Sequence, residues 1–202
     1  HFSTWLEQAD IDGHPCIVAM SSMSAESKHE SPLAEERALS QRLREAEARL
    51  ARTCARRGMR WTVLRATLIY GGGHDHSLTP LARRAQRWRV FPLPAGRGLR
   101  QPVHAADLAE AVRAALHTDA AGGKVLPVGG GERLTAARMF ARVRQGLPGW
   151  TLPVPVPRLV LRAAARFFPR GRGAIMRLDA DLVADNRELI ACLGVHPRDF
   201  RP

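Results

Sequence analysis

The stretch WTVLRATLIYGGGH, residues 61–74, decides the expected fold. An apolar run leads to Arg65, a second short apolar run leads to Tyr70, and three glycines follow. A short continuous apolar run bounded by turn-forming residues is typical of a strand that is buried on both faces, as in a parallel sheet. We therefore predict a strand over residues 59–64, with Arg65 at its carboxyl end.

A matching pattern precedes this strand. The apolar run 16–20 follows a His-Pro break and ends in serines, and residues 31–58 have helical periodicity. Ser31 is the expected N-cap with Pro32 in the first helical position, and Gly58 is the expected C-cap. The apolar stripe of this helix consists of Leu39, Leu43, Ala46, Leu50 and Cys54. Strand, helix and strand in this order predict a right-handed crossover in a parallel sheet, so the expected class is α/β.

The rest of the chain continues this alternation. We expect helices at 77–88, 107–121, 135–143 and 159–168, a strand at 124–128, and a loop at 91–94. Residues 148–157 are rich in proline. No run of eighteen apolar residues occurs, so no transmembrane helix is expected.

The net charge of +12 could indicate a nucleic-acid-binding protein. Only Lys28 and Lys124 are lysines, so nearly all of the positive charge is arginine. The arginines are spread along the chain and aromatic residues do not alternate with them as base-stacking platforms would require. We interpret most of them as solvated and do not expect nucleic-acid binding. The basic amphipathic segment 158–168 could lie on a membrane surface, and a lid or lobe helix is the favoured alternative.

The chain contains three cysteines, Cys16, Cys54 and Cys192. Their odd number and wide spacing favour reduced thiols in a cytoplasmic protein over a disulfide framework. The sequence starts at His1 without a methionine or a signal peptide pattern. We therefore expect that the chain begins inside a longer protein.

Polar residues follow the first two predicted strands. Ser21, Ser22 and Ser24 come after the first strand and Arg65 comes after the second. Ligands of open α/β sheets bind at the carboxyl ends of the strands, and an arginine there suits bidentate contact with phosphate or carboxylate. We predict that Ser22 and Arg65 share one rim of a ligand site.

Other motifs carry less information. Neither glycine run, 71–73 or 129–131, has the spacing of a phosphate-binding loop, and both are expected to form turns with positive φ. Residues 74–76 read His-Asp-His, but three adjacent side chains do not converge on one ion, so no metal site is expected. His104 suits either substrate contact or a structural role, and Asp107 suits a helix start.

In this order, the segments MSS, WTVLRATLIYG, RQPVHAADLAEAV, GGKVLPVGGGERLT and DNRELIACLGVHPRDFRP resemble those of extended and atypical short-chain dehydrogenase/reductases. More narrowly, they are similar to the NAD-dependent epimerase/dehydratase group that acts on nucleotide sugars. The resemblance covers residues 16–202.

The resemblance implies a Rossmann-type doubly wound parallel sheet with a small mixed substrate lobe. Residues 1–147 would form the C-terminal part of the NAD(P)-binding domain with interleaved lobe segments, and residues 148–202 the substrate lobe and tail. The dinucleotide fingerprint would lie on an N-terminal portion that this sequence does not contain. The implied cofactor is NAD or NADP, and the implied partner is a nucleotide sugar or another small molecule, with a homodimer left open.

The resemblance also implies roles for individual residues. The cofactor-binding residues would be Ser21, Ser22, Ala66, Thr67 and Ile69. The substrate-binding residues would be Arg65, Tyr70, Arg100 and His104. The family usually has proline where this chain has Ala66, so we expect a looser loop there.

The catalytic pattern departs from the family. Its serine-type position falls on Met23, and its tyrosine and lysine positions fall on Leu39 and Leu43. Leucine neither transfers a proton nor shifts a pKa. Ser22, Ser24 and Lys28 are the substitutes that we consider. Two functions stay open. The first is an NAD(P)-dependent oxidoreductase that resembles nucleotide-sugar epimerases and dehydratases but has a degenerate tyrosine–lysine pair. The second is a non-catalytic NAD(P)-binding protein with a regulatory or assembly role.

Overall fold

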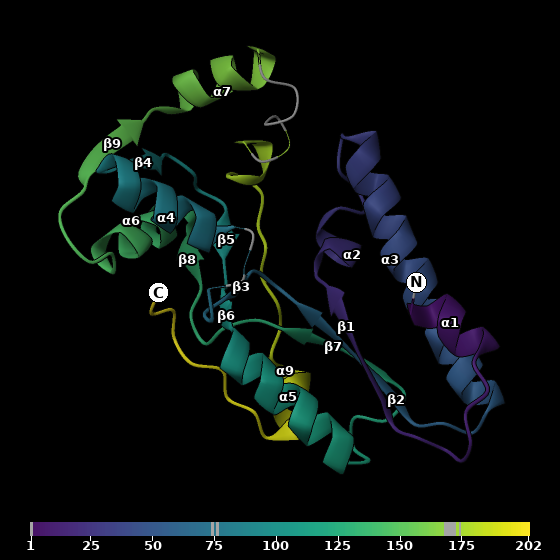
Figure 1. Ribbon diagram of the computed structural model, residues 1–202. Helices are drawn as coiled ribbons and strands as arrows, with labels where there is room; N and C mark the ends of the chain where they lie inside the picture. The colour runs from purple at the N-terminus through teal and green to yellow at the C-terminus, as the bar shows by residue number, and fades with distance from the viewer. Residues whose placement is uncertain (1, 74, 76, 168–172, 174) are drawn as a thin grey trace. The chain divides into compact units, whose positions relative to one another are not determined.

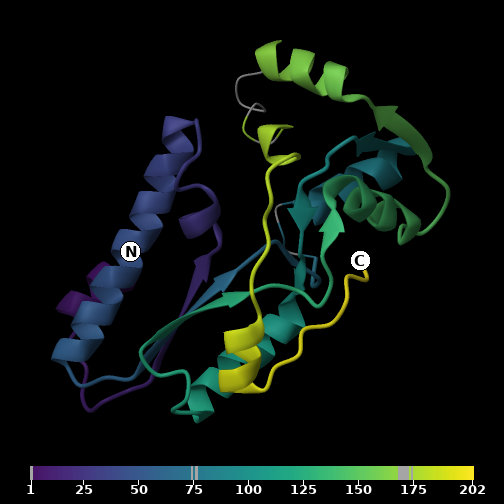
Figure 2. The same cartoon turned by 180° about the vertical axis from the view of Figure 1, so that it is seen from behind.

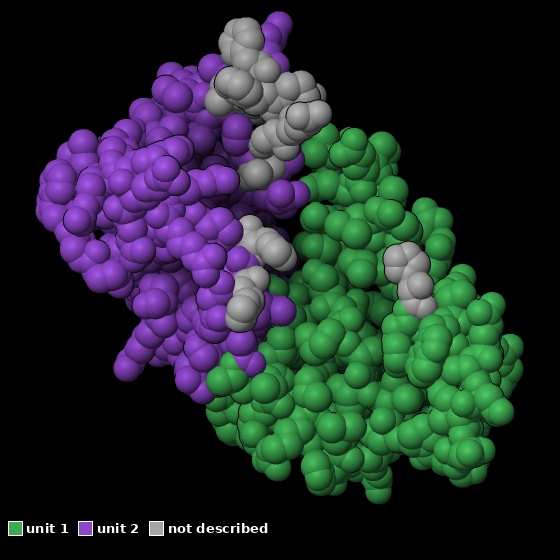
Figure 3. Space-filling model, in the orientation of Figure 1, with its two compact units in different colours: residues 1–67, 106–129, 184–196 green, residues 68–105, 130–183, 197–202 purple. Residues whose placement is uncertain are grey.

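The computed structural model describes residues 2–73, 75, 77–167, 173 and 175–202. These residues form two compact units, each assembled from three segments of the chain (Figure 3). Unit 1 consists of residues 1–67, 106–129 and 184–196, and unit 2 consists of residues 68–105, 130–183 and 197–202. The sequence predicts a domain boundary between residues 147 and 148, and this boundary stays a prediction.

Unit 1 is built on a parallel sheet. Its strands are β1 (Ile17–Ser22), β2 (Trp61–Ala66) and β7 (Lys124–Val128), in the order β1-β2-β7. β1 covers residues 17–20 of the first predicted strand and β2 covers residues 61–64 of the second, and each strand ends two residues later than expected. The predicted crossover between parallel strands is confirmed by the helix that joins β1 to β2.

Helices cover both faces of this sheet. Figures 1 and 2 show α1 (Phe2–Gln8) and α3 (Ala34–Arg56) on one face, and α5 (Ala105–His117) and α9 (Arg187–Leu193) on the other. The core between α1, α3 and the sheet consists of Leu6, Leu50, Cys54, Met59 and Val63. This arrangement confirms the prediction of an α/β, Rossmann-type, doubly wound parallel sheet.

The start of α3 differs from the expected cap. The helix begins at Ala34, and Ser31 belongs to the preceding turn. The Ser31 hydroxyl accepts a hydrogen bond from the Leu33 amide (3.2 Å) and donates one to Glu36 Oε2 (2.7 Å). Ser31 therefore stabilises the approach to the helix, because its side chain satisfies the turn before the first helical residue. The predicted end is confirmed, since Gly58 adopts φ +64° just after the helix.

Unit 2 combines short strand pairs with helices. The parallel pairs are β3 (Ile69–Tyr70) with β6 (Val103–His104) and β4 (Val90–Pro94) with β9 (Leu152–Val156). The antiparallel pair is β5 (Leu99–Arg100) with β8 (Leu134–Thr135). The helices include α4 (Leu78–Trp88), α6 (Ala136–Gln145) and α7 (Arg158–Phe167). This composition confirms a small mixed lobe. Among the described residues, no helix has both the length and the apolar character needed to cross a bilayer.

The core of unit 2 corrects the prediction of a loop at residues 91–94. Those residues belong to β4, and Phe91 is completely buried among Tyr70, Met139 and Phe200. Proline is tolerated in a strand that has a neighbour on one side only, because its missing N–H can face away from that neighbour. The prolines of β4 therefore mark a two-stranded ribbon, where the sequence analysis took them for a loop.

Candidate functional site

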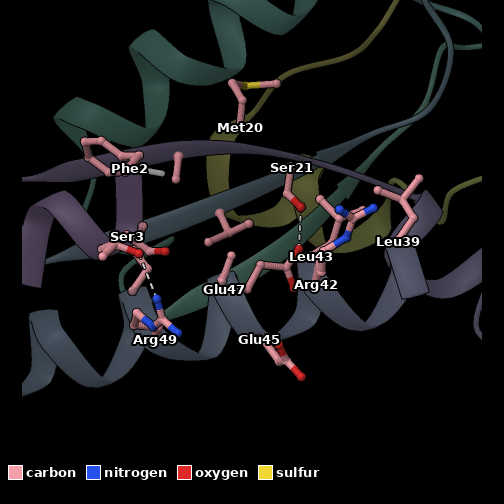
Figure 4. A pocket seen from close by; sticks show the side chains of 15 residues that line it. Phe2, Ser3, Met20, Ser21, Leu39, Arg42, Leu43, Glu45, Glu47 and Arg49 are labelled. Atoms are coloured by element: carbon pink, nitrogen blue, oxygen red, sulfur yellow. Dashed lines mark hydrogen bonds between the residues drawn. The ribbon is translucent and has the colours of Figure 1, made fainter. Parts of the chain in front are cut away.

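The strand ends of unit 1 bring three side chains together. Ser21 of β1 lies opposite Arg65 of β2, and both side chains meet Glu47 of α3. The Ser21 hydroxyl donates a hydrogen bond to Glu47 Oε1 (Figure 4). Arg65 Nε donates to both Glu47 oxygens, at 3.0 and 3.2 Å, and its Nη2 also donates to Glu47. The carboxylate therefore links the two strand ends to the helix.

The guanidinium of Arg65 has a second carboxylate partner. Its Nη1 donates to Glu26 Oε1. The Arg65 and Glu47 side chains are 15% and 9% exposed, whereas that of Glu26 is 53% exposed. The hydrogen bond with Glu47 raises the pKa of Arg65, although burial opposes the shift. Arg65 is thus held on one side by a buried carboxylate and on the other by an exposed one.

The three proposed catalytic substitutes are engaged in the turn after β1. The Ser22 hydroxyl accepts a hydrogen bond from the Ser24 amide at 3.1 Å. Ser24 begins the short helix α2 (Ser24–Ser27). Lys28 Nζ lies 3.8 Å from Glu36 Oε1, and both of these side chains are largely buried. The side chains of Ser22 and Lys28 thus have structural partners, and the catalytic roles of all three residues stay predictions.

Ser22 and Arg65 do lie at neighbouring strand ends, as predicted, but their side chains have different partners. Ser22 lies opposite Ala66, one position beyond Arg65, and alternate residues of a strand face opposite sides. Ser21 is the serine that shares a carboxylate with Arg65. The side chains of Ser22 and Arg65 therefore face opposite sides of the sheet, and their shared ligand site stays a prediction.

Backbone hydrogen bonds close the strand ends at the predicted cofactor segment. The Met23 amide donates to the Ala66 carbonyl, and the Thr67 amide donates to the Val128 carbonyl, both at 2.9 Å. Met23, Ala66 and Thr67 are all buried. Ile69 follows in unit 2 and is 37% exposed. Met23, at the family's serine position, is an apolar side chain in the core.

A pocket of about 490 Å³ lies beside the Ser21 hydroxyl (Figure 4). Leu39 and Leu43 line it from α3, and Ala19 and Met20 line it from β1. The two leucines are four residues apart, so they face the same side of the helix. The positions that resemble the family's tyrosine and lysine therefore do face a pocket, but they present hydrocarbon to it.

In unit 2, Tyr70 belongs to the core. It is 3% exposed, and its ring contacts those of His104 and Phe200 with centroids 5.1 and 4.8 Å away. Its hydroxyl donates to the Asp199 carbonyl at 3.4 Å and accepts from the Arg201 amide at 3.2 Å. Tyr70 thereby ties the end of the chain to β3. Its predicted contact with substrate stays a prediction.

The glycines after Tyr70 have a local reason. Gly71 adopts φ +86°, and a Cβ atom there would collide with the imidazole of His104. The run 71–73 thus forms the predicted positive-φ turn. The run 129–131 does not have positive φ, which corrects the second prediction. Position 130 requires glycine because a Cβ atom there would collide with the Pro102 carbonyl.

Arg100 is a buried arginine of unit 2, with 7% of its surface exposed. Its guanidinium donates to the carbonyls of Leu99 (2.8 Å), Ala180 (2.6 Å) and Arg177. Desolvation lowers the pKa of Arg100, and the field of Asp181 opposes this effect. These carbonyls use the donors that the sequence analysis assigned to a substrate diphosphate, and that assignment stays a prediction.

Asp75 caps α4. Its carboxylate accepts hydrogen bonds from the amides of Ser77 (3.0 Å), Leu78 (2.6 Å) and Thr79 (3.1 Å). Burial would raise its pKa, but hydrogen bonds from Thr79, Ser77 and Leu78 outweigh burial and lower the pKa to about 2. His74 and His76 lie outside the described residues. Within the part of the chain that the structure describes, no group of three His, Cys, Asp or Glu side chains could hold a metal ion.

Glu47 is the residue whose role the sequence analysis missed. It is 8% exposed and lies within the apolar stripe of α3, between Leu43 and Leu50. A carboxylate at such a position is almost always paired when buried. Its position in the apolar stripe indicated a buried, paired carboxylate. The sequence could not identify its partners, because Ser21 and Arg65 belong to two other elements.

Comparison with known proteins identifies a matching protein family. The model of the NAD-dependent epimerase/dehydratase family matches residues 19–129. No curated protein matches the sequence at a significant level.

Solved structures share the fold at low identity. UDP-glucuronic acid 4-epimerase of Bacillus cereus, in complex with NAD, has a TM-score of 0.68 and 13% identity, over 98% of this chain and 60% of that chain. UDP-glucose 4-epimerase of Thermotoga maritima, with UDP-glucose, has a TM-score of 0.65 and 17% identity, over 93% and 60%.

A dTDP-glucose 4,6-dehydratase of Bacillus anthracis, in complex with NAD, has a TM-score of 0.64 and 17% identity, over 90% of this chain and 56% of that chain. The chain thus spans less than two thirds of each of these proteins. The family model covers more than half of the sequence, and the parallel sheet has the fold of these structures. The chain belongs to the NAD-dependent epimerase/dehydratase family.

Proposed function

We propose that the protein binds NAD(P) and a nucleotide sugar but lacks the proton-transfer pair that its family uses. Family membership supports the cofactor, and structural neighbours were solved with NAD and with UDP-glucuronic acid or UDP-glucose. The lack of a proton-transfer pair is supported by one observation: Leu39 and Leu43 line the pocket beside Ser21. Neither side chain can donate or accept a proton.

The residues of unit 1 suit one end of a dinucleotide. Ala19, Met20, Leu39 and Leu43 give the pocket an apolar wall against which a flat ring can pack, and the Ser21 hydroxyl lies at its edge. The 202-residue sequence contains no glycine-rich fingerprint to cradle the diphosphate. We propose that Ser21, Ser22, Ala66 and Thr67 contact the nicotinamide end. When bound, NAD(P) would supply hydride transfer.

Arg65 is the better of the two arginine candidates for the substrate. Its partner Glu26 is half exposed, so an anionic ligand can replace Glu26 while Glu47 keeps the guanidinium in place. The donors of Arg100 reach backbone carbonyls of unit 2. We propose that Arg65, rather than Arg100, contacts an anionic group of the ligand.

The second candidate is turnover with an unusual proton donor. One observation favours it: the Ser21 hydroxyl lies on the pocket and donates to the Glu47 carboxylate, which could accept its proton. The non-catalytic function fits better, because the side chains of Ser22 and Lys28 have structural partners and Met23 is buried. The protein would then act as a ligand-dependent regulatory or assembly subunit.

Equilibrium binding tests the proposal. Calorimetric titration of the full-length protein with NAD, NADP and UDP-glucose should show binding of a cofactor and of the sugar. Arg65→Lys keeps the charge but loses the planar fork, so sugar affinity should fall roughly tenfold, about 1.4 kcal/mol. The exposed Arg56→Lys is the matched control and should change nothing. Absence of cofactor binding, or equal affinity in both variants, would contradict the proposal.

A further inference from the structure

The net positive charge of the chain comes from unit 2. Unit 2 contains 18 arginines against five Asp and Glu residues, a net charge of +13, whereas unit 1 contains 13 Lys and Arg against 14 Asp and Glu, a net charge of −1. Residues 76–105 and 133–178 contain no acidic residue. The arginines seemed evenly spread along the sequence because the two units alternate along the chain. The folded protein therefore has one nearly neutral unit and one strongly basic unit.

The ribbon of β4 and β9 exposes an apolar face in this basic unit. Val90 lies opposite Leu152, and Pro92 lies opposite Val154, so these four side chains share one side of the ribbon. Val90, Leu152 and Val154 are 40%, 46% and 38% exposed. Phe91, on the other side, is completely buried. A solvated face of a strand pair is normally polar, and this one is not.

Two exposed tryptophans adjoin the start of the ribbon. Trp88 and Trp150 stand two residues before Val90 and Leu152, and each is 68% exposed. Arg89 joins them, because its Nη1 donates to the Trp150 carbonyl (3.3 Å) and its own carbonyl accepts from the Leu152 amide (2.8 Å). We call Trp88, Val90, Trp150, Leu152 and Val154 the ribbon face.

Arginines and a second apolar element adjoin the ribbon face. Arg84 and Arg87 lie on exposed positions of α4, just before Trp88. The helix α7 begins two residues after β9 (Figure 1), and its Leu159 and Val160 are 77% and 54% exposed. Apolar and cationic side chains thus occur together on consecutive elements of unit 2.

We propose that the ribbon face docks on a membrane surface that contains anionic phospholipids. Tryptophan prefers the interface between headgroups and acyl chains, aliphatic side chains enter the upper acyl region, and arginines bind phosphate headgroups. A second copy of this chain is disfavoured because both surfaces carry strong positive charge. Single-stranded nucleic acid would use aromatic faces and arginines, but Val90, Leu152 and Val154 offer no stacking surface. This surface goes beyond the proposed function and does not depend on cofactor binding.

Vesicle binding of the full-length protein tests the proposal. Sedimentation with vesicles of phosphatidylcholine alone is compared with vesicles of phosphatidylcholine and phosphatidylglycerol in equal parts. We expect binding to the anionic vesicles only, accompanied by a blue shift of tryptophan emission. Trp88→Ser with Trp150→Ser should weaken binding about tenfold or more. Trp5→Ser is the matched control, because Trp5 is 56% exposed in unit 1, and it should leave binding unchanged.

The arginines provide a second, independent readout. Arg84→Gln with Arg87→Gln should weaken binding about fivefold for each charge removed. Arg52→Gln with Arg56→Gln, on exposed positions of unit 1, should leave it unchanged. Equal binding to neutral and anionic vesicles, equal loss in the Trp5 control, or single-stranded DNA that displaces the protein from vesicles would each overturn the proposal.

Discussion

The two units of this protein bury an arginine in opposite ways. Unit 1 surrounds Arg65 with the carboxylates of Glu47 and Glu26, whereas unit 2 surrounds Arg100 with three backbone carbonyls. The pKa of Arg65 is raised by its hydrogen bond with Glu47, and that of Arg100 is lowered by desolvation. A carboxylate partner can be exchanged for another anion, but a set of backbone carbonyls fixes the fold. This difference supports the proposal that Arg65, rather than Arg100, contacts the ligand.

The largest effect should come from removing the buried carboxylate of unit 1. Glu47→Ala leaves the charge of Arg65 and the Ser21 hydroxyl without their shared partner. Breaking a buried ion pair in this way should lower the free energy of unfolding by about 3–5 kcal/mol. Urea titration measures it, with Glu45→Ala as the control, because Glu45 is exposed on the same helix. Similar losses in both variants would refute the special role of Glu47.

Arg100→Ala should have the next largest effect. It removes the guanidinium that donates to the carbonyls of Leu99, Arg177 and Ala180 and opens a cavity in unit 2. We expect a loss of about 3 kcal/mol in the free energy of unfolding, with sugar affinity unchanged in the folded fraction. Arg97→Ala, at an exposed position in the same segment, should cost little. A folded, fully stable variant that binds the sugar weakly would reverse the roles of the two arginines.

The smallest effect concerns the cap of α4. Asp75→Ala removes the acceptor for the first amides of the helix and should cost about 1–2 kcal/mol. Because the folded-state pKa of Asp75 is lowered from 3.8 to about 2, its contribution is present above pH 3.8. It should disappear as the pH falls from 3.8 to 2. Urea titrations of both proteins across this range check it, and a difference that is independent of pH would exclude the ionised cap.

The sheet of unit 1 could be predicted from sequence because its strands are continuous apolar runs. The start of α3 could not be predicted, since Ser31 and Pro32 satisfy the rules of a helix start while the chain uses them in the preceding turn. The ribbon of unit 2 could not be predicted, because 57 residues separate the end of β4 from the start of β9 and their pairing depends on tertiary packing.

Only part of the candidate site could be predicted from the sequence. Strand order located Arg65 at a strand end, and the family pattern located Leu39 and Leu43. The partners of Arg65 and Arg100 come from elements distant in sequence, so no local pattern announces them. The separation of charge between the units is likewise invisible in the sequence, because it appears only when the interleaved segments are sorted by unit.

The most direct test of the central claim is a redox measurement on the full-length protein. The protein saturated with NAD or NADP is mixed with a panel of UDP- and dTDP-sugars, and the absorbance of reduced nicotinamide is followed. Because leucines occupy positions 39 and 43, the account predicts that the cofactor stays bound and the absorbance does not change with any sugar. Reduction of the bound cofactor by a sugar in the native protein would contradict it.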